Sequence, residues 1–426
     1  MKNKAIVAIL ATLLLASITA IATPARAQPT DNMWINMDPP VAPPARSDVC
    51  MVYDSENEVV VLFGGGAYWT QRWNWFGDTW IYSVKTNTWT NMNPAVAPCP
   101  RTFHGMAYDS DNKVVVLFGG QDNSGTLLGD TWIYNVKTNT WTNMNPAVAP
   151  SPREANAMAY DSKNKKVVLH GLPSYYSAQA ETWTYDVSTN TWTNMEPSTL
   201  PQTGYPANLE YDSANNVMVL LFYLDVWTYS LDTNTWTKRE PATQPPLRWT
   251  GMDVLAYDSE NGRMILFGGF QWYQWFDDTW AYNVKENTWT NLNPSVSPPG
   301  RGAHGIVYDS KNKVVVMFGG DSGWYDPGKL LSDTWIYIYY PDPKVSTQKL
   351  IETIRTWNLP KGTENSLTSK LQNAIQSLEN GQQNAAINKL NAFINEVKAQ
   401  SGKKLTNAQA DALIAEAQRI INTIQG

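Results

Sequence analysis

The stretch RTFHGMAYDSDNKVVVLFGGQDNSGTLLGDTWIYNVKTNTWTN, from Arg101 to Asn143, decides the fold of this chain. Its pattern recurs in six copies, at a period of about fifty residues that is typical of repeat architectures. In every copy a tyrosine precedes an Asp-Ser pair, and a later tryptophan stands two residues ahead of another tyrosine. A unit of this kind buries its apolar face only against its neighbours. These residues are Tyr53, Tyr108, Tyr160, Tyr211, Tyr257 and Tyr308, and Trp80, Trp132, Trp183, Trp227, Trp280 and Trp335.

Each copy contains four segments of high β-propensity, separated by turns of Asn, Asp, Ser and Gly. In the second copy we expect strands over residues 101–109, 113–118, 130–136 and 140–144. Four short antiparallel strands in a unit of this length form one blade of a β-propeller. The sequence therefore predicts an all-β, six-bladed β-propeller over residues 30–342.

Recurring glycine pairs and the segments Asp-Thr-Trp-x-Tyr and Asn-Thr-Trp-Thr resemble the kelch repeat, the type found in the central domain of galactose oxidase. The third copy departs from the glycine pattern at residues 169–171, and the fourth at residues 221–223, where almost no loop follows. The sixth copy lacks its Asn-Thr-Trp strand. We expect residues 34–37 to supply that strand and to close the ring.

After residue 342 the repeat stops, and apolar residues recur at helical spacing in a C-terminal module over residues 343–426. Gly381 and Gly402 are suited to helix C-caps, and Thr406 with Gln409 is suited to a capping box. The pattern predicts a small bundle of four helices. It resembles the FIMAH-type module of secreted and cell-surface prokaryotic hydrolases and binding proteins, which implies an extracytoplasmic location.

Residues 1–27 have the features of a signal peptide: two lysines, an apolar run, and a small-x-small cleavage site at residues 25–27. An uncleaved anchor is the alternative, because the apolar run is long. We expect a secreted or cell-surface protein that does not span the membrane once this segment is removed. The segment holds three of the 32 basic residues and none of the 38 acidic ones, so the mature chain is more acidic than its net charge of −6. Such a charge disfavours nucleic acid as a partner.

Cys50 and Cys99 are the only cysteines. An even number in an oxidising compartment favours a disulfide, and both residues stand near the inner strands of adjacent blades. Spacing alone does not show whether their Cα atoms come within bridging range, so two thiols are the alternative.

The loops between the second and third strands differ from copy to copy, whereas the turns of the opposite rim are nearly identical. Functional residues of a scaffold concentrate on such variable loops. Those of blades one, five and six are rich in aromatic residues, which suit stacking against sugar rings. Alternatively, these side chains fold back onto the blade tops or pack against the helical bundle. The candidate ligand-binding residues are Tyr68, Trp69, Trp73, Trp75, Trp272, Tyr273, Trp275, Trp324 and Tyr325.

An arginine begins five of the six inner strands, at the channel mouth on the same face. Five guanidiniums around one opening could bind the carboxylate of a uronic acid or of a peptide. Because Pro-Arg belongs to the repeat pattern, the alternative is a scaffold role in which each arginine bonds carbonyls of the neighbouring blade. The five are Arg46, Arg101, Arg153, Arg248 and Arg301.

No catalytic centre emerges from the sequence, and we expect neither a metal nor another cofactor. A copper site of the galactose oxidase type needs clustered imidazole and tyrosinate ligands, but only three histidines exist, His104, His170 and His304. Paired carboxylates of a glycoside hydrolase or lyase stay open, because their separation cannot be read from sequence. The candidates on the rim are Asp48, Glu154, Asp253, Asp277 and Asp326.

The sequence therefore favours a secreted, non-catalytic binding or adhesion protein, acting as a monomer. Its partner would be a polysaccharide or a cell-surface glycoprotein, bound by the aromatic loop face. The alternatives are a protein–protein interaction scaffold and a carbohydrate-active enzyme, whether hydrolase, lyase or oxidase.

Overall fold

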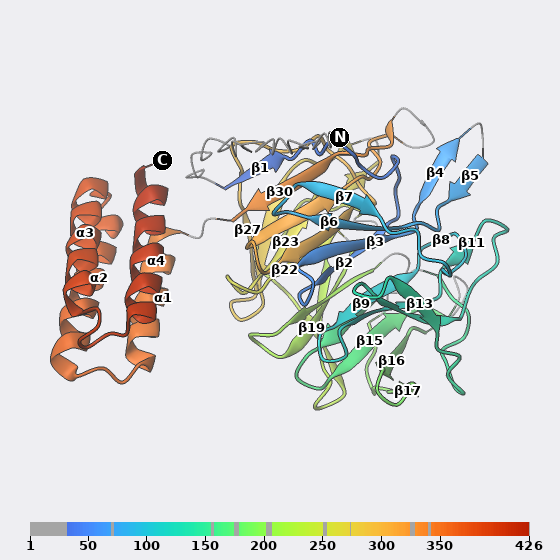
Figure 1. Ribbon diagram of the computed structural model, residues 1–426, viewed down its shortest axis with the longest axis horizontal. Coiled ribbons are helices and arrows are strands. Elements are labelled where there is room, and N and C mark those ends of the chain that lie inside the picture. Colours follow the sequence, from blue (N-terminus) through green and yellow to red (C-terminus); the bar gives the residue numbers. More distant parts are fainter. Residues whose placement is uncertain are drawn as a thin grey trace, which may run out of the picture.

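The computed structural model describes residues 32–69, 72–154, 157–173, 179–201, 207–249, 254–272, 274–323, 329–339 and 342–425. These residues form six four-stranded antiparallel sheets and, after them, four helices (Figure 1). The sheets are the blades of a β-propeller, and the helices form a bundle beside it (Figure 1). The predicted fold class is confirmed. The proposed signal segment, residues 1–27, lies outside the described residues.

Each blade runs from an inner strand at the channel to an outer strand at the rim. The inner strands are β2 (Cys50–Asp54), β9 (Gly105–Asp109), β14 (Ala157–Asp161), β18 (Asn208–Asp212), β22 (Leu255–Asp258) and β28 (Gly305–Asp309). The second strands are β3 (Val59–Phe63), β10 (Val114–Phe118), β15 (Lys166–Gly171), β19 (Val217–Phe222), β23 (Arg263–Phe267) and β29 (Val314–Phe318). The third strands are β6 (Thr79–Ser83), β12 (Thr131–Asn135), β16 (Glu181–Asp186), β20 (Asp225–Ser230), β26 (Thr279–Asn283) and β30 (Thr334–Ile338). The outer strands are β7 (Thr88–Asn91), β13 (Thr140–Asn143), β17 (Thr191–Asn194), β21 (Thr235–Arg239), β27 (Thr288–Asn291) and β1 (Met33–Asn36).

Short additional strands rise from the loops that follow the second strands. β4 (Gly66–Trp69) pairs with β5 (Arg72–Trp75) in blade one, and β24 (Phe270–Gln271) pairs with β25 (Gln274–Trp275) in blade five. In blade two, β11 (Gln121–Asp122) pairs with β8 (Arg101–Thr102). The described loops of blades one, two and five thus carry short paired strands, and the β4–β5 hairpin stands clear of the ring in Figure 1.

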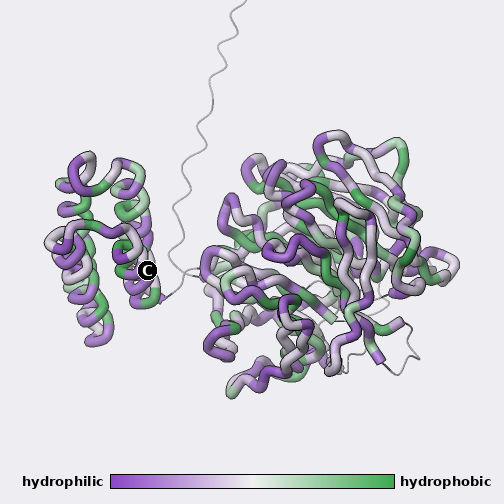
Figure 2. Tube along the Cα trace, turned by 90° about the horizontal axis from the view of Figure 1, so that it is seen from below, coloured by the Kyte–Doolittle hydropathy of each residue, from purple (hydrophilic) through white to green (hydrophobic). Residues whose placement is uncertain are grey.

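The second strands explain why each copy carries a continuous apolar run instead of an alternating one. Every residue of β10 is buried. Val115 and Leu117 pack with residues of blade one, whereas Val116 and Phe118 pack with residues of blade three. Successive side chains of a strand point to opposite faces, so a blade between two others must be apolar on both. Figure 2 accordingly shows hydrophobic stretches inside the ring and hydrophilic turns around it.

A repeated hydrogen bond joins neighbouring blades. The indole of each outer-strand tryptophan donates to the hydroxyl of a threonine that starts the third strand of the preceding blade. Five seams have this bond, at 2.8–3.0 Å: Trp34 to Thr279, Trp89 to Thr334, Trp141 to Thr79, Trp192 to Thr131, and Trp236 to Thr182. At the seam of blades four and five, Val226 takes the threonine position, and the buried Trp289 indole N–H has no hydrogen-bond partner.

The ring is closed as the sequence predicts. β1 pairs with β30 in antiparallel register, with Trp34 opposite Tyr337, and so completes the sixth blade. Trp34 is fully buried, and its ring packs against Phe267 of blade five at a centroid distance of 4.9 Å. The N-terminal strand therefore holds the two ends of the propeller together.

The C-terminal module consists of α1 (Pro343–Thr356), α2 (Lys361–Glu379), α3 (Gln383–Gln400) and α4 (Asn407–Gln425). Its buried apolar residues form one cluster of their own. The expected capping box is present: Gln409 N donates to Thr406 Oγ1 at 3.2 Å, and Thr406 N donates to Gln409 Oε1 at 2.9 Å. Gly381 and Gly402 follow helix ends with φ near 70°. Among the helices of the described residues, none is long and apolar enough to cross a membrane.

Candidate functional site

The five arginines at the channel mouth are fully buried and ion-paired. Arg46 donates to both carboxylate oxygens of Asp78, at 2.6 and 2.9 Å, and to the carbonyl of Gly64 at 3.0 Å. Burial alone would raise the pKa of Asp78, but the hydrogen bond and charge of Arg46 lower it below its ordinary value. The same clamp recurs as Arg101–Asp130, Arg248–Asp278 and Arg301–Asp333, and Arg153 pairs with Glu181 through Nη2 at 2.7 Å.

This arrangement favours the scaffold role of the arginines over the ligand-binding role considered for them. Guanidiniums with no exposed surface and with carboxylate partners in place cannot receive a ligand from solvent. They belong to the scaffold, although the carbonyl that each bonds lies in its own blade and not in the neighbouring one. The bond between blades runs through the backbone instead. The carbonyl of Arg46, for example, accepts from Gly320 N of blade six at 2.9 Å.

The three histidines are buried and neutral. Burial lowers the pKa of His104, His170 and His304 to about 3 in each case. Both ring nitrogens of His104 and of His304 are without a hydrogen-bond partner, whereas His170 Nδ1 lies 3.1 Å from the Thr182 hydroxyl. Within the described part of the chain, no group of three His, Cys, Asp or Glu side chains is placed to hold a metal ion.

The two cysteines are thiols in this structure, which is the alternative considered beside a disulfide. The buried Cys50 thiol lies 2.7 Å from the carbonyl oxygen of His104. Cys99 is exposed, and its sulfur accepts from the Arg101 guanidinium at 3.3 Å. Each sulfur therefore has its own partner, and the two are not joined.

The candidate carboxylates do not show a common centre. Asp48 accepts a hydrogen bond from the Ser47 hydroxyl at 2.9 Å, and burial raises the pKa of Glu154. Asp277 is exposed. Asp253 and Asp326 lie outside the described residues.

The predicted aromatic residues fall into three groups: packed, exposed, and outside the described part of the structure. Trp75 is anchored to blade two, because its indole donates to the Asp122 carbonyl at 2.8 Å. Trp275 packs against Phe270 at a centroid distance of 5.1 Å. Trp272, in the turn between β24 and β25, is 86% exposed. The side chains of Tyr68, Trp69 and Trp73 lie outside the described part of the structure, as do residues Tyr273, Trp324 and Tyr325.

An aromatic row, composed of Tyr223, Trp249, Phe270 and Trp275, crosses from blade four to blade five. Successive ring centroids are 6.4, 5.3 and 5.1 Å apart. Backbone hydrogen bonds fix the row: Trp249 N donates to the Phe270 carbonyl at 2.6 Å, and Phe270 N donates to the Trp249 carbonyl at 2.9 Å. Sequence reasoning missed Tyr223 and Trp249. The signal was the shortened loop of the fourth copy, which puts a tyrosine where other copies carry long insertions.

The opposite end of the channel is generic. A cavity of about 260 Å³ is lined there by the tyrosine that precedes Asp-Ser in every copy. Tyr160 donates to Asp111 at 2.6 Å and Tyr257 donates to Asp212 at 2.8 Å, each reaching the preceding blade. These residues join the blades, as expected for the rim that is alike in all copies.

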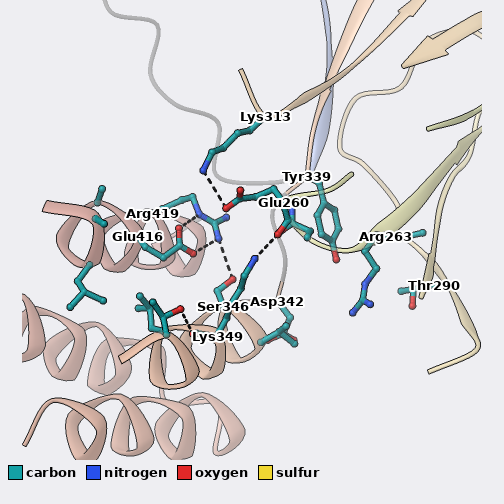
Figure 3. A pocket seen from close by; sticks show the side chains of 18 of the residues that line it. Glu260, Arg263, Thr290, Lys313, Tyr339, Asp342, Ser346, Lys349, Glu416 and Arg419 are labelled. Atoms are coloured by element: carbon teal, nitrogen blue, oxygen red, sulfur yellow. Dashed lines mark hydrogen bonds and ion pairs between the residues drawn. The ribbon is translucent and has the colours of Figure 1, made fainter. Parts of the chain in front are cut away.

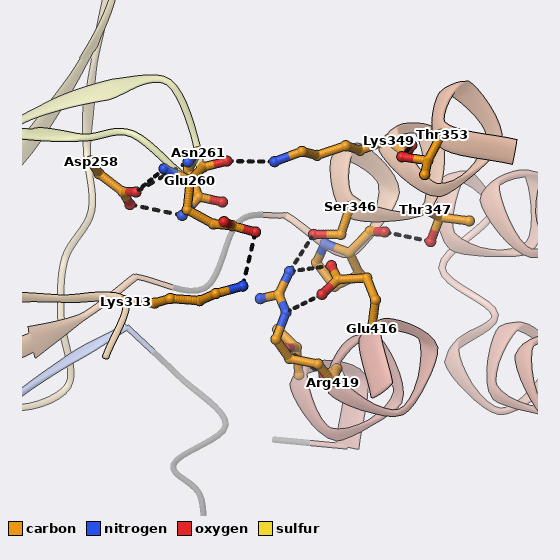
Figure 4. Close-up of polar contacts among 12 residues, drawn as sticks. Asp258, Glu260, Asn261, Lys313, Ser346, Thr347, Lys349, Thr353, Glu416 and Arg419 are labelled. Atoms are coloured by element: carbon orange, nitrogen blue, oxygen red, sulfur yellow. Dashed lines mark hydrogen bonds and ion pairs between the residues drawn. The ribbon is translucent and has the colours of Figure 1, made fainter. Parts of the chain in front are cut away.

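A second cavity, of about 640 Å³, lies where the helical module meets the propeller (Figure 3). Lys349 of α1 donates to the Glu260 carbonyl at 2.5 Å, and Lys313 pairs with the Glu260 carboxylate at 3.2 Å. On the other side, Arg419 pairs with Glu416 and donates to the Ser346 hydroxyl at 3.3 Å (Figure 4). These lysine and arginine side chains already have acceptors within the chain. We therefore interpret the cavity as a space at the contact between the module and the propeller, and not as a ligand-binding site.

Comparison with known families identifies both parts of the chain. Residues 27–209 and 220–346 match the KLHDC2/KLHL20/DRC7 Kelch-repeats domain family. The chain belongs to the kelch-repeat family. Residues 346–422 match the FIMAH domain. Both resemblances drawn from the sequence are thereby confirmed.

Similar kelch proteins come from several eukaryotes. Mei4-dependent protein 6 of Schizosaccharomyces pombe is 24% identical over 276 residues, which cover 60% of this chain and 32% of that protein. An F-box/kelch-repeat protein of Arabidopsis thaliana is 25% identical over 313 residues, 62% of this chain and 64% of the relative. Kelch domain-containing protein 1 of Mus musculus is 25% identical over 194 residues, 40% of this chain and 46% of the relative. The chain thus spans less than two thirds of each of them.

Blade four departs most from the kelch pattern. Its second and third strands are joined by Tyr223 and Leu224 alone, and Tyr223 has a φ of 52°. It has Val226 in place of the seam threonine, and Asp225 pairs with the exposed Lys238 at 3.1 Å. The aromatic row begins at this blade, so the irregular part of the kelch ring and the aromatic cluster coincide.

Proposed function

We propose that this kelch protein is a secreted, non-catalytic binding protein that recognises the glycan of a polysaccharide or of a cell-surface glycoprotein. Its binding surface is the aromatic face of blades four and five. A kelch propeller by itself suggests a protein partner, and a glycoprotein would combine both kinds of contact. The location rests on the signal-like residues 1–27 and on the low share of charged residues, 16% of the chain.

The observation that carries this proposal is the exposure of Trp272. An indole that is 86% exposed leaves a large apolar surface in water, and it stands on a backbone with a φ of 56°. This left-handed conformation places Trp272 at the turn between β24 and β25, where its side chain projects from the hairpin. Exposed apolar surface is typical of a binding site where it belongs to a contiguous patch, and Trp272 stands in the same hairpin as the partly exposed Phe270 and Trp275.

The surroundings of Trp272 suit a sugar. Gln271 and Gln274 flank it and provide amides that can both donate and accept hydrogen bonds from hydroxyl groups. An indole face covers the C–H side of a pyranose ring, while amides bond its hydroxyls. A site of few charges, with aromatic and amide groups, therefore favours a neutral glycan.

The proposal is tested with a glycan array, followed by calorimetry on the glycans retained. Trp272→Ala should weaken binding at least tenfold. Val148→Ala is the control, because Val148 is also exposed, at 58%, but lies in the connection that follows β13. No glycan retained by the wild type, or equal binding by Trp272→Ala, would refute the proposal. Capture of a deglycosylated protein by the same face would assign the site to the protein-scaffold alternative.

A further inference from the structure

We propose that the cationic end of the helical module binds an acidic polysaccharide, which gives the chain a second binding surface besides the propeller face. The cationic end is where α1 connects to α2 and where α3 connects to α4, and it carries Arg355, Lys361, Lys398, Lys403 and Lys404. From the proposed function this inference takes only the extracytoplasmic location, and the two sites can be tested separately.

Charge is divided unevenly between the two parts of the chain. Residues 343–426 hold 10 of the 32 basic residues and 6 of the 38 acidic ones, so the module has a net positive charge. Residues 28–342 hold 19 basic and 32 acidic residues, so the propeller has a net negative charge. Charge asymmetry of this kind is typical of chains in which one part meets an anionic partner.

The topology of the bundle gathers the positive charge of the module at one end. Consecutive helices are antiparallel and joined by short connections, so the α1–α2 and α3–α4 connections lie together, opposite the C-terminus (Figure 1). These connections, with the helical turns that flank them, hold five basic residues and one acidic residue, Glu364. The equivalent segments of the other end hold only Lys344 and Glu379. The net positive charge of the module therefore lies at the cationic end.

The cations of this end also differ from others of the module in their partners. Lys370 pairs with the Glu396 carboxylate, midway along the bundle. Arg419 pairs with Glu416 of its own helix. By contrast, all five cations of the cationic end are exposed, and among the described residues none of them forms an ion pair. Lys403 donates to a backbone carbonyl at 3.1 Å, which leaves its charge without a counterion. This end can therefore receive an anion from solvent.

Helix stability does not account for three of these cations. Positive charge stabilises the C-terminus of a helix and destabilises its N-terminus. Lys361 is the first residue of α2, and Lys403 and Lys404 stand shortly before α4. The N-cap of α2, Pro360, provides no side-chain hydrogen bond to the helix. These three lysines therefore do not stabilise the helices at whose starts they stand, and an external anion gives them a role.

The chemistry of the cationic end favours one class of anion. Its large apolar side chains, Trp357, Leu359 and Leu405, pack against the core of the bundle. Protein partners and single-stranded nucleic acids are recognised largely through exposed aromatic or apolar side chains, and membrane-surface helices insert such side chains. Long, exposed lysines without them suit a flexible polymer whose negative charges repeat along its length. Outside the cell, an acidic polysaccharide is such a polymer, and the negative propeller confines the contact to the module.

The test measures binding of the full chain to immobilised polygalacturonate, an acidic polysaccharide, by biolayer interferometry. We expect binding at 50 mM NaCl that weakens about tenfold or more at 200 mM, because contacts of this kind release counterions. Lys403→Glu combined with Lys404→Glu should weaken binding about tenfold or more, since it replaces two attractions with repulsions. Lys403→Arg combined with Lys404→Arg should bind within about twofold of the wild type, because arginine keeps the charge.

The matched control combines Lys85→Glu and Lys137→Glu, two exposed lysines of the propeller. It has the same net charge as the Lys403→Glu, Lys404→Glu variant, so an equal loss in both would mean that net charge alone governs binding and would refute the site. No binding of polygalacturonate at 50 mM NaCl refutes it too. Tighter binding to double-stranded DNA, or to phosphatidylglycerol vesicles, would assign the cationic end to another partner and overturn the inference.

Trp272→Ala separates this inference from the proposed function. The variant should lose the neutral glycan and keep polygalacturonate. If it loses polygalacturonate as well, the propeller face binds both polymers and the module site is refuted. If the wild type retains no glycan on the array but binds polygalacturonate through Lys403 and Lys404, the proposed function fails and the site on the module stands.

Discussion

Val226→Thr should stabilise the propeller, because it supplies the hydrogen bond that one seam lacks. Trp289 is 4% exposed, and its indole N–H has no acceptor, whereas the equivalent indoles of the other five seams donate to a threonine hydroxyl at 2.8–3.0 Å. Val226 is 1% exposed and stands at the threonine position. Threonine has nearly the shape of valine, so its hydroxyl replaces one methyl group and provides the acceptor that the Trp289 indole lacks.

The expected gain is about 1 kcal/mol, the net contribution of a typical buried hydrogen bond. The reverse change, Thr79→Val, removes the acceptor of Trp141 at another seam and should cost about 1–3 kcal/mol, since it leaves a buried donor unsatisfied. For a propeller of this size, 1 kcal/mol corresponds to roughly 1–2 °C in Tm, so the free energy of unfolding from urea titration is the better measure.

Hydrogen exchange of the Trp289 indole, followed by NMR, reports on the bond itself. Slower exchange in Val226→Thr, together with higher stability, is the expected result. If Val226→Thr is neutral or destabilising while Thr79→Val is also neutral, then seam hydrogen bonds do not determine blade-to-blade stability. The missing threonine of blade four would then have no effect on the stability of the ring.

Three further changes test other parts of the structure. His104 and His304 have pKa values of about 3, below the unfolded value of about 6.5, so the folded state binds fewer protons and stability is lost as pH falls below 6.5. Each histidine should make the free energy of unfolding fall by about 1.4 kcal/mol per pH unit. Both are replaced with valine, the residue that blade one has at this position as Val49. The free energy of unfolding from urea titration should then depend less on pH between pH 6 and 4. Arg101→Lys should cost about 2 kcal/mol in urea unfolding, because a lysine cannot replace the bidentate pair with Asp130; an unchanged midpoint would contradict the clamp. Lys349→Ala removes one exposed bond and should change stability by less than about 0.5 kcal/mol by the same assay; a larger loss would mean a firmer contact between module and propeller.

The sequence was sufficient to predict the fold because the same blade pattern occurs in six copies. Turn residues, apolar runs and the Asp-Thr-Trp segment recur together, and even the strand that closes the ring could be found from the missing one in the sixth copy. The sequence also contained a sign of the scaffold role of the arginines. Every copy that has the arginine has an Asp or Glu directly before Thr-Trp, and this carboxylate is the ion-pair partner of the arginine.

The proposed binding surface was harder to predict because its aromatic residues do not recur from one copy of the repeat to the next. Trp272 and Trp275 could be found as aromatic residues in one loop, but Tyr223 and Trp249 come from another blade and another connection. Only the folded ring brings these segments together. The fate of Trp75, which bonds to blade two, likewise depends on the neighbouring loop and not on its own sequence.

Because β1 pairs with β30, the ring can close only after nearly the whole propeller has been synthesised. The ribosome makes residues 33–36 near the start of synthesis, yet their partners in β30, residues 335–338, are made only after five blades. Until then the ring cannot close. The earlier blades form an open arc, and β1 has no partner strand.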